Sequence, residues 1–91
     1  MKLLQIHPDD NVAVALEDIQ AGEELQLDDQ TVTAFENIAR GHKVALRDIH
    51  VDEDIIKYGE SLGEATKEIV AGDYVHVHNL DSKRGRGDWE D

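Results

Sequence analysis

Cysteine is absent from this sequence of 91 residues, and proline occurs once. Without thiols the chain forms neither disulfides nor Cys-ligated zinc sites, and it has no thiolate nucleophile. One Phe, one Trp and two Tyr are too few for a platform on which nucleic-acid bases stack. The chain has only nine Lys and Arg but 21 Asp and Glu, which gives a formal net charge of −12. This balance argues against binding to nucleic acid or to anionic membrane surfaces.

Long apolar runs are also missing. The first seven residues contain no run long enough for a signal peptide, and no later run could span a bilayer. We therefore expect an acidic, cytoplasmic protein. Hydrophobic residues make up 40% of the chain and recur in short runs, which favours a folded domain over a disordered chain. A domain this small buries a modest core, so we also expect an obligate partner.

The short apolar runs are rich in Val, Ile and Leu, which predicts β-strands. Expected strands cover residues 3–6, 12–16, 43–49, 54–58 and 74–80. Two other segments could be helical: residues 30–40, where helix and strand are equally supported, and a short turn at 64–69. The sequence therefore predicts a mainly β fold of short strands and hairpins with one or two short helical turns.

An internal repeat organises the chain. Val-Ala-Leu-Glu-Asp-Ile at residues 14–19 recurs as Val-Ala-Leu-Arg-Asp-Ile at residues 44–49, and a weaker third copy covers 68–75. Each copy predicts a strand, an acidic turn and a second strand. Units this short bury a face only by packing against one another, which predicts pseudo-symmetric hairpins. Chance similarity in a chain rich in Val, Ile, Asp and Glu is the alternative.

The last eleven residues differ from the rest of the chain. Residues 81–91 contain no aliphatic side chain and hold three of the nine cations. We expect a folded domain over residues 1–80 followed by a flexible C-terminal tail.

Five histidines are the most reactive side chains in the sequence. His76 and His78 lie two residues apart in an expected strand, which places both rings on one face, within reach of one metal ion or one anionic substrate. A solvated strand face is the alternative. No Ser-His-Asp set, phosphate-binding Gly loop or His-Glu-x-x-His helix occurs.

Polar turns supply the other candidates. His7, Asp9 and Asn11 surround the single proline and could present hydrogen-bonding groups to a polyol, although Asp and Asn also stabilise turns. His42 and Lys43 follow a glycine and could pair with a carboxylate. The segment Lys-Tyr-Gly-Glu at residues 57–60 has a similar arrangement.

Four ordered blocks carry a family resemblance. They are His-Pro-Asp-Asp-Asn-Val at 7–12, Gly-His-Lys-Val-Ala-Leu-Arg-Asp-Ile at 41–49, Ile-Lys-Tyr-Gly at 56–59 and Val-His-Val-His-Asn-Leu at 75–80. In these blocks the chain resembles the small subunits of altronate dehydratase, in a family that includes galactarate dehydratase and sulfolactate sulfo-lyase. The resemblance covers about residues 4–80 and implies a SAF domain, a β-clip of short strands.

The resemblance also implies a function. It implies a hydro-lyase that acts on a sugar acid such as altronate, removes the proton α to the carboxylate and expels the β-hydroxyl, with Fe²⁺ or Mn²⁺ assisting. A chain this short is then expected to be inactive without a large dehydratase subunit, and to self-associate through exposed strands when isolated. The alternatives are the small subunit of a sulfolactate-type sulfo-lyase and a non-catalytic module that binds sugar acids.

The resemblance assigns roles to individual residues. His42 and Lys43 are the expected catalytic pair at the substrate's carboxylate or hydroxyls, and His76 and His78 are expected to serve a metal or proton transfer. The expected substrate-binding residues are His7, Asp9, Asn11, Gly41, Tyr58, Gly59 and Asn79. Purely structural use of the Gly and Asn positions remains the alternative.

Overall fold

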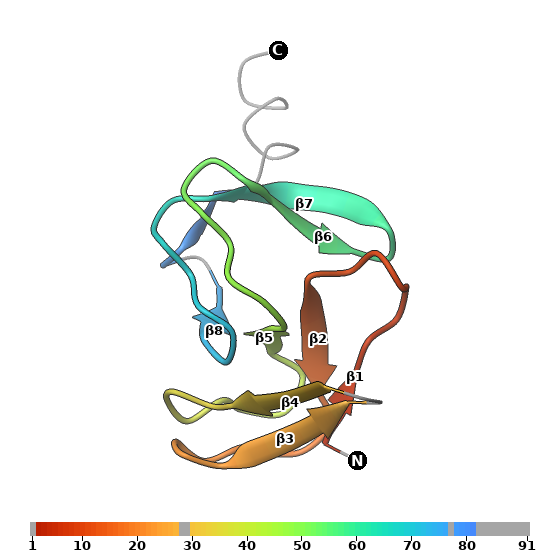
Figure 1. Ribbon diagram of the computed structural model, residues 1–91, viewed down its shortest axis with the longest axis vertical. Helices are drawn as coiled ribbons and strands as arrows, with labels where there is room; N and C mark the ends of the chain where they lie inside the picture. Colours follow the sequence, from red (N-terminus) through yellow and green to blue (C-terminus); the bar gives the residue numbers. More distant parts are fainter. Residues whose placement is uncertain (1, 28–29, 77, 82–91) are drawn as a thin grey trace.

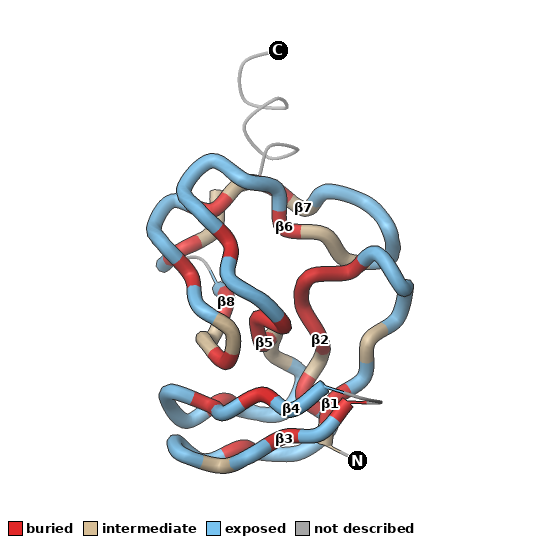
Figure 2. The backbone as a smooth tube through the Cα atoms, viewed as in Figure 1, coloured by how far each residue is buried: buried red, intermediate tan, exposed pale blue. Residues whose placement is uncertain are grey.

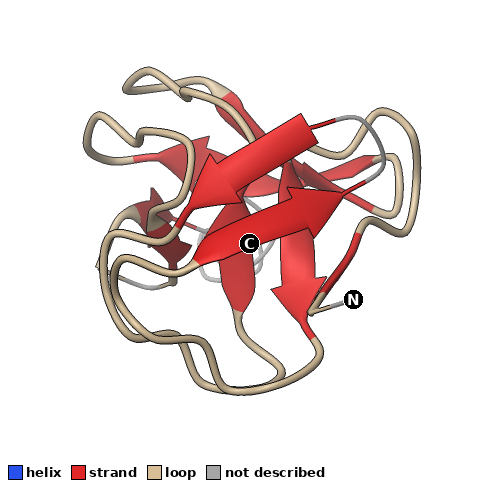
Figure 3. Cartoon of the chain, turned by 60° about the horizontal axis from the view of Figure 1, so that its bottom comes forward, coloured by secondary structure: helices blue, strands red, loops and turns tan. Residues whose placement is uncertain are grey.

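The computed structural model describes residues 2–27, 30–76 and 78–81. All regular elements in these ranges are strands, as Figure 3 shows, which confirms the mainly β fold. The strands are β1 (Leu3–Leu4), β2 (Val12–Ala15), β3 (Glu24–Leu27), β4 (Gln30–Thr33), β5 (Lys43–Ala45), β6 (Asp54–Lys57), β7 (Glu60–Ala65), β8 (Tyr74–Val75) and β9 (Leu80–Asp81).

The short helical turn predicted at residues 64–69 is wrong, and of the two alternatives for residues 30–40 the strand is the one observed, because no helix occurs in the described ranges. Thr31, Val32 and Thr33 are β-branched and pair with β3 in a hairpin, where their branched side chains fit better than in a helix. In the second segment, residues 64 and 65 complete β7 and Ile69 forms an isolated bridge to Ile49.

The strands form three antiparallel sheets. The central sheet has the order β1-β2-β5-β8, and Figure 1 shows it between the β3–β4 hairpin below and the β6–β7 hairpin above. β9 pairs with β7 and completes the upper sheet. In the middle of the central sheet, Val12 pairs with Ala45 and Ala13 with Val44.

Two hydrophobic cores lie on opposite faces of the central sheet. Because side chains alternate along a strand, Ala13 and Val44 join the core against β3 and β4, whereas Val12 and Ala45 join the core against β6 and β7. Figure 2 shows the buried residues along β2 and β5 and the exposed ones in the outer loops. The central sheet is therefore buried on both sides over much of its area.

The predicted repeat is present, and the structure contains four copies of it. Each copy has the form Ala-x-x-x-Ile-x-x, followed by a residue with positive φ. The copies begin at Ala15, Ala34, Ala45 and Ala65, and the residues with positive φ are Gly22, Gly41, Asp52 and Gly72.

Copies interlock in pairs rather than folding separately. Ile19 bridges Ile38, and Ile49 bridges Ile69. In each pair, the polar side chain three residues after the Ala accepts a hydrogen bond from the turn amide of the other copy. Thus the Asp18 carboxylate accepts from the Arg40 amide at 3.0 Å, and Asn37, Asp48 and Glu68 act in the same way at 2.8–3.0 Å. We call the pair of copies that begin at Ala15 and Ala34 the first clip, and the pair that begin at Ala45 and Ala65 the second clip. The carboxylates used in these hydrogen bonds account for part of the acidity of the chain.

The strand predicted over residues 74–80 is interrupted. β8 ends at Val75, and a turn closes where the Asn79 amide donates to the His76 carbonyl at 3.0 Å. The chain then resumes as β9, so the assumption that His76 and His78 share one strand is wrong. Asp81, the first residue of the predicted tail, lies in β9, and residues 82–91 lie outside the described residues. No helix among the described residues is long and apolar enough to cross a membrane.

Candidate functional site

Four aromatic rings gather at the edge of the central sheet where β8 ends. The Tyr74 ring stacks on His76 with centroids 5.5 Å apart and an interplanar angle of 9°. His42 lies 5.3 Å from both rings, and His78 lies 5.4 Å from Tyr74. The Tyr74 hydroxyl is hydrogen-bonded to Nδ1 of His42. We call His42, Tyr74, His76 and His78 the ring cluster.

His42 departs from the repeat to which it belongs. In three copies, the position after the positive-φ residue holds a carboxylate that accepts a hydrogen bond from its own turn: Glu23, Glu53 and Asp73. The second copy has His42 there, and its ring contacts Tyr74 and His76 instead. A residue that departs from the pattern shared by the equivalent positions of a repeat is often there for function and not for folding.

The turn that supports the ring cluster is held by Asn79. Its side-chain amide donates to the Tyr74 carbonyl at 2.9 Å and accepts from the His76 amide at 3.0 Å. Asn79 is also buried, with 5% of its surface exposed. The structural alternative considered for Asn79 therefore has direct support, because both polar ends of its side chain hold the turn.

Lys43 is not brought together with His42. Lys43 pairs with Val75 across the sheet, on the face of the second core, whereas Tyr74 packs against the first core. Burial, and to a lesser extent the nearby charge of Lys57, lowers the pKa of Lys43. The two residues expected to act as a pair thus point to opposite faces of the central sheet.

A second group of predicted residues meets where the turn after β1 reaches the β6–β7 hairpin. A Cβ atom on Gly59 would lie 3.1 Å from the His7 ring, and the φ of Gly59 is +72°. His7 Nδ1 accepts from the Asp9 amide at 3.1 Å. Tyr58 precedes Gly59 and has a positive φ of 59°. The sequence thus correctly grouped His7 and Asp9, but the contact with Gly59 needed the fold.

Asp10, which the sequence analysis did not select, holds this group together. Its carboxylate accepts hydrogen bonds from the amides of His7 at 3.0 Å, Tyr58 at 3.1 Å and Gly59 at 2.8 Å. Burial opposes ionisation of Asp10, but these three hydrogen bonds outweigh it, so the pKa of Asp10 lies below its ordinary value. The only sequence signal was an Asp beside a Pro-containing turn.

Replacing Asp10 with Asn should destabilise the domain by about 2–3 kcal/mol at neutral pH, because an NH₂ group then faces an amide that needs an acceptor. The folded pKa of Asp10 is depressed, so its contribution is present above the unfolded pKa and is lost as pH falls through the folded pKa. Urea unfolding at about pH 7 and about pH 2 should show the difference between wild type and Asp10→Asn shrinking in acid. An equal difference at both pH values would contradict this role.

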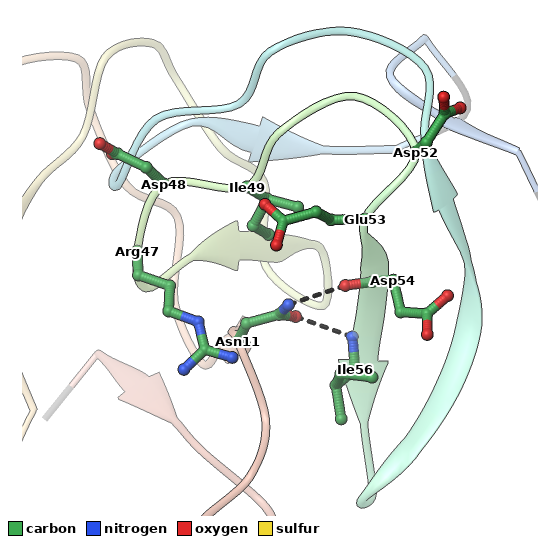
Figure 4. A pocket seen from close by; sticks show the side chains of 8 residues that line it. All are labelled: Asn11, Arg47, Asp48, Ile49, Asp52, Glu53, Asp54 and Ile56. Carbon is green, nitrogen blue, oxygen red and sulfur yellow. Dashed lines mark hydrogen bonds between the residues drawn. The ribbon is translucent and has the colours of Figure 1, made fainter.

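Asn11 lines a pocket between the turn after β1 and the second clip. Figure 4 shows its amide pointing at β6, where it donates to the Asp54 carbonyl at 2.9 Å and accepts from the Ile56 amide at 2.7 Å. The other lining residues are Arg47, Asp48, Ile49, Asp52, Glu53, Asp54 and Ile56. Four carboxylates around one guanidinium repel an anionic ligand. This pocket therefore does not suit a sugar acid, and Asn11 has a structural role.

Metal ligation receives no support from the side chains that the structure describes. Across residues 2–27, 30–76 and 78–81, no three His, Asp or Glu side chains are arranged to hold a metal ion. The ring cluster does place three imidazoles around a phenol, and imidazole exchanges protons near neutral pH. Proton transfer is thus the chemistry that the ring cluster offers by itself.

Comparison with known proteins identifies the family of this module. Residues 1–83 match the altronate/galactarate dehydratase SAF domain. The chain is 46% identical over its whole length to altronate dehydratase of Escherichia coli (strain K12), but spans only 20% of that protein. It is 36% identical to galactarate dehydratase (L-threo-forming) of the same organism over 79% of the chain and 14% of that protein.

A shorter protein is also similar. Over 84% of this chain and 88% of its own length, the (2R)-sulfolactate sulfo-lyase subunit alpha of Chromohalobacter salexigens is 40% identical. The same module thus occurs as a small part of long proteins and as nearly the whole of a short one.

Proposed function

Because the chain belongs to the altronate/galactarate dehydratase SAF domain family, we propose that it is the small module of a cytoplasmic sugar-acid hydro-lyase. Its match to one-fifth of altronate dehydratase is the observation that carries this proposal. We call the partner that would correspond to the other four-fifths of that protein the dehydratase body. The chain then supplies residues to a site that the dehydratase body completes, and it is inactive alone.

The ring cluster gives the module a defined task. Nδ1 of His42 is held by the Tyr74 hydroxyl, which leaves Nε2 to exchange a proton with the substrate. In the dehydration, a base takes the proton α to the carboxylate, and the β-hydroxyl leaves as water after it is protonated. The resulting enol tautomerises to a 2-keto-3-deoxy acid. His42 acts as the acid or base, and His76, stacked on Tyr74, positions it.

The metal belongs mainly to the dehydratase body in this proposal. A divalent Fe²⁺ or Mn²⁺ ion would stabilise the negative charge that develops on the substrate. The described residues of this chain do not form a ligand set for it. His76 and His78, both exposed at the turn after β8, remain available to add a ligand or to bind a substrate hydroxyl.

The length of the chain favours a second candidate function, that of a sulfo-lyase subunit. The chain matches most of the sulfo-lyase subunit alpha, which is a separate small protein. The same ring cluster could then serve expulsion of sulfite instead of water from a related acid. A non-catalytic module for binding sugar acids is the remaining alternative.

Turnover of a substrate panel separates these candidates. The chain and its dehydratase body, purified as a complex, are assayed on altronate, galactarate and sulfolactate with Fe²⁺ or Mn²⁺ added. We expect keto-acid formation from a sugar acid. Sulfite release would instead establish the sulfo-lyase, and binding of all three acids without turnover would establish the non-catalytic module.

A further inference from the structure

One face of the central sheet is only half covered. Directly paired residues point to the same side of a sheet, so Leu4, Val14, Lys43 and Val75 form a row across β1, β2, β5 and β8. Val75 is fully buried beneath the upper sheet, but Leu4 is 45% exposed. The upper sheet therefore covers the β5–β8 half and the Val12 end of β2, and it leaves Leu4 on β1 open, with Val14 only partly covered.

The open half is aliphatic. The Leu16 amide donates to the Lys2 carbonyl at 2.7 Å, which continues the β1–β2 ladder, so Leu16 lies on the same face as Val14. Leu16 is 42% exposed. With the partly buried Val14 between them, these two leucines make a contiguous aliphatic surface on one sheet, and contiguity is what distinguishes an interaction surface from scattered exposed side chains.

Two lysines border these leucines. Lys43 is half-buried in the same row, and Lys57 on β6 is close enough for its charge to affect Lys43. No ion pair within the described ranges joins either lysine to a carboxylate. Glu60 lies directly opposite Lys57 in the β6–β7 hairpin, which leaves Lys43 as the cation of this row with no carboxylate partner among the described residues.

We infer that this open face, made of Leu4, Val14, Leu16, Lys43 and Lys57, docks the dehydratase body through an aliphatic surface that carries a carboxylate. The inference rests on the proposed function, since it assumes that such a body exists. In the relatives, this module is either part of a longer protein or a subunit, so one of its surfaces must meet the remainder. The open face offers aliphatic area and uncompensated positive charge for that contact.

A second copy of this chain fits the same face poorly. A two-fold contact through this face would bring the lysines of both copies into one interface. Two chains with a net charge of −12 would also repel each other. Charge complementarity therefore favours the dehydratase body.

The test compares Leu16→Glu with Val51→Glu. Val51 is 45% exposed, close to the 42% of Leu16, but lies in the turn before β6. Binding of each variant to the purified dehydratase body is measured by analytical ultracentrifugation, after thermal melts show that both fold. We expect the Kd to rise about 100-fold for Leu16→Glu and less than about threefold for Val51→Glu. Lys43→Gln with Lys57→Gln should weaken the dependence of Kd on salt.

Crosslinking gives a readout that does not need tight binding. Because the chain has no cysteine, Leu16→Cys and Val51→Cys each carry a single thiol for a photoreactive label. A crosslink to the dehydratase body from position 16 alone supports the inference. Equal crosslinking from both positions, or dimers of this chain linked through position 16, would overturn it while leaving the proposed function intact if the complex still turns over a sugar acid. Failure of the wild-type chain to bind the body or support turnover would overturn both.

Discussion

Replacing Gly72 with Ala should prevent the domain from folding. Gly72 has a φ of +98°, and an added Cβ would lie 2.9 Å from the carbonyl carbon of Thr33 and closer still to its oxygen. Both atoms are backbone, and Thr33 lies in the β3–β4 hairpin, so the clash cannot be relieved by turning a side chain. We expect a loss of more than about 4 kcal/mol, against a total of only about 5–14 kcal/mol for a domain of this length.

Gly22→Ala is the matched control. Gly22 holds the same position in the repeat and has a φ of +86°, but no atom lies within 4 Å of its added Cβ. Only the cost of a positive φ remains, about 1–2 kcal/mol. Urea unfolding of both variants should therefore show a folded Gly22→Ala protein and an unfolded or barely folded Gly72→Ala protein. Similar losses of stability for the two variants would mean that Gly72 does not approach the backbone of Thr33 as closely as the structure shows.

Replacing His42 with Gln should reduce turnover of the assembled enzyme at least about 100-fold, because general acid–base catalysis contributes about 10²–10⁴ to the rate. Gln keeps a polar side chain of similar size but cannot exchange a proton near neutral pH. We expect kcat to fall while KM changes less than about threefold, since the proton moves in the transition state. Steady-state kinetics of the complex on its sugar acid measure both.

Two further variants separate catalysis from packing. His50→Gln removes an exposed histidine that is not part of the ring cluster and whose Nδ1 lies 2.8 Å from the Glu68 carboxylate, so it should leave kcat unchanged. Tyr74→Phe removes the hydroxyl bound to His42 and should lower kcat rather than abolish activity, because the ring of His42 is then held less firmly. An unchanged kcat in His42→Gln would remove His42 from the mechanism.

Much of the fold was predictable because its elements are local. Alternating Val and Ala at residues 12–15 formed the expected strand, and the repeat at 14–19 and 44–49 was visible as a sequence identity. The copy that begins at Ala34 was missed and the copy that begins at Ala65 was seen only in part, as the weak third copy at 68–75, because Phe35 and Thr66 replace the Leu that follows the Ala in the other copies. Searching for Ala-x-x-x-Ile alone would have found all four.

Long-range pairing set the limits of the sequence analysis. Residues 74–80 have perfect period-two spacing, yet Asn79 closes a turn against His76 and divides the strand. Likewise, Asp10 gains its importance from amides of Tyr58 and Gly59, which no local pattern connects to it. His76 stacks on Tyr74 from its own predicted strand, but it also contacts His42, which precedes β5 and was not grouped with it beforehand.

The rate of sugar-acid dehydration with and without this chain tests the account most directly. The dehydratase body alone, the chain alone and the two together are assayed on altronate with Fe²⁺ or Mn²⁺ present. We predict keto-acid formation only when both are present, with the rate saturating as the chain reaches a fixed stoichiometry. A dehydratase body that is equally fast without the chain would contradict the claim that this module supplies residues to the active site.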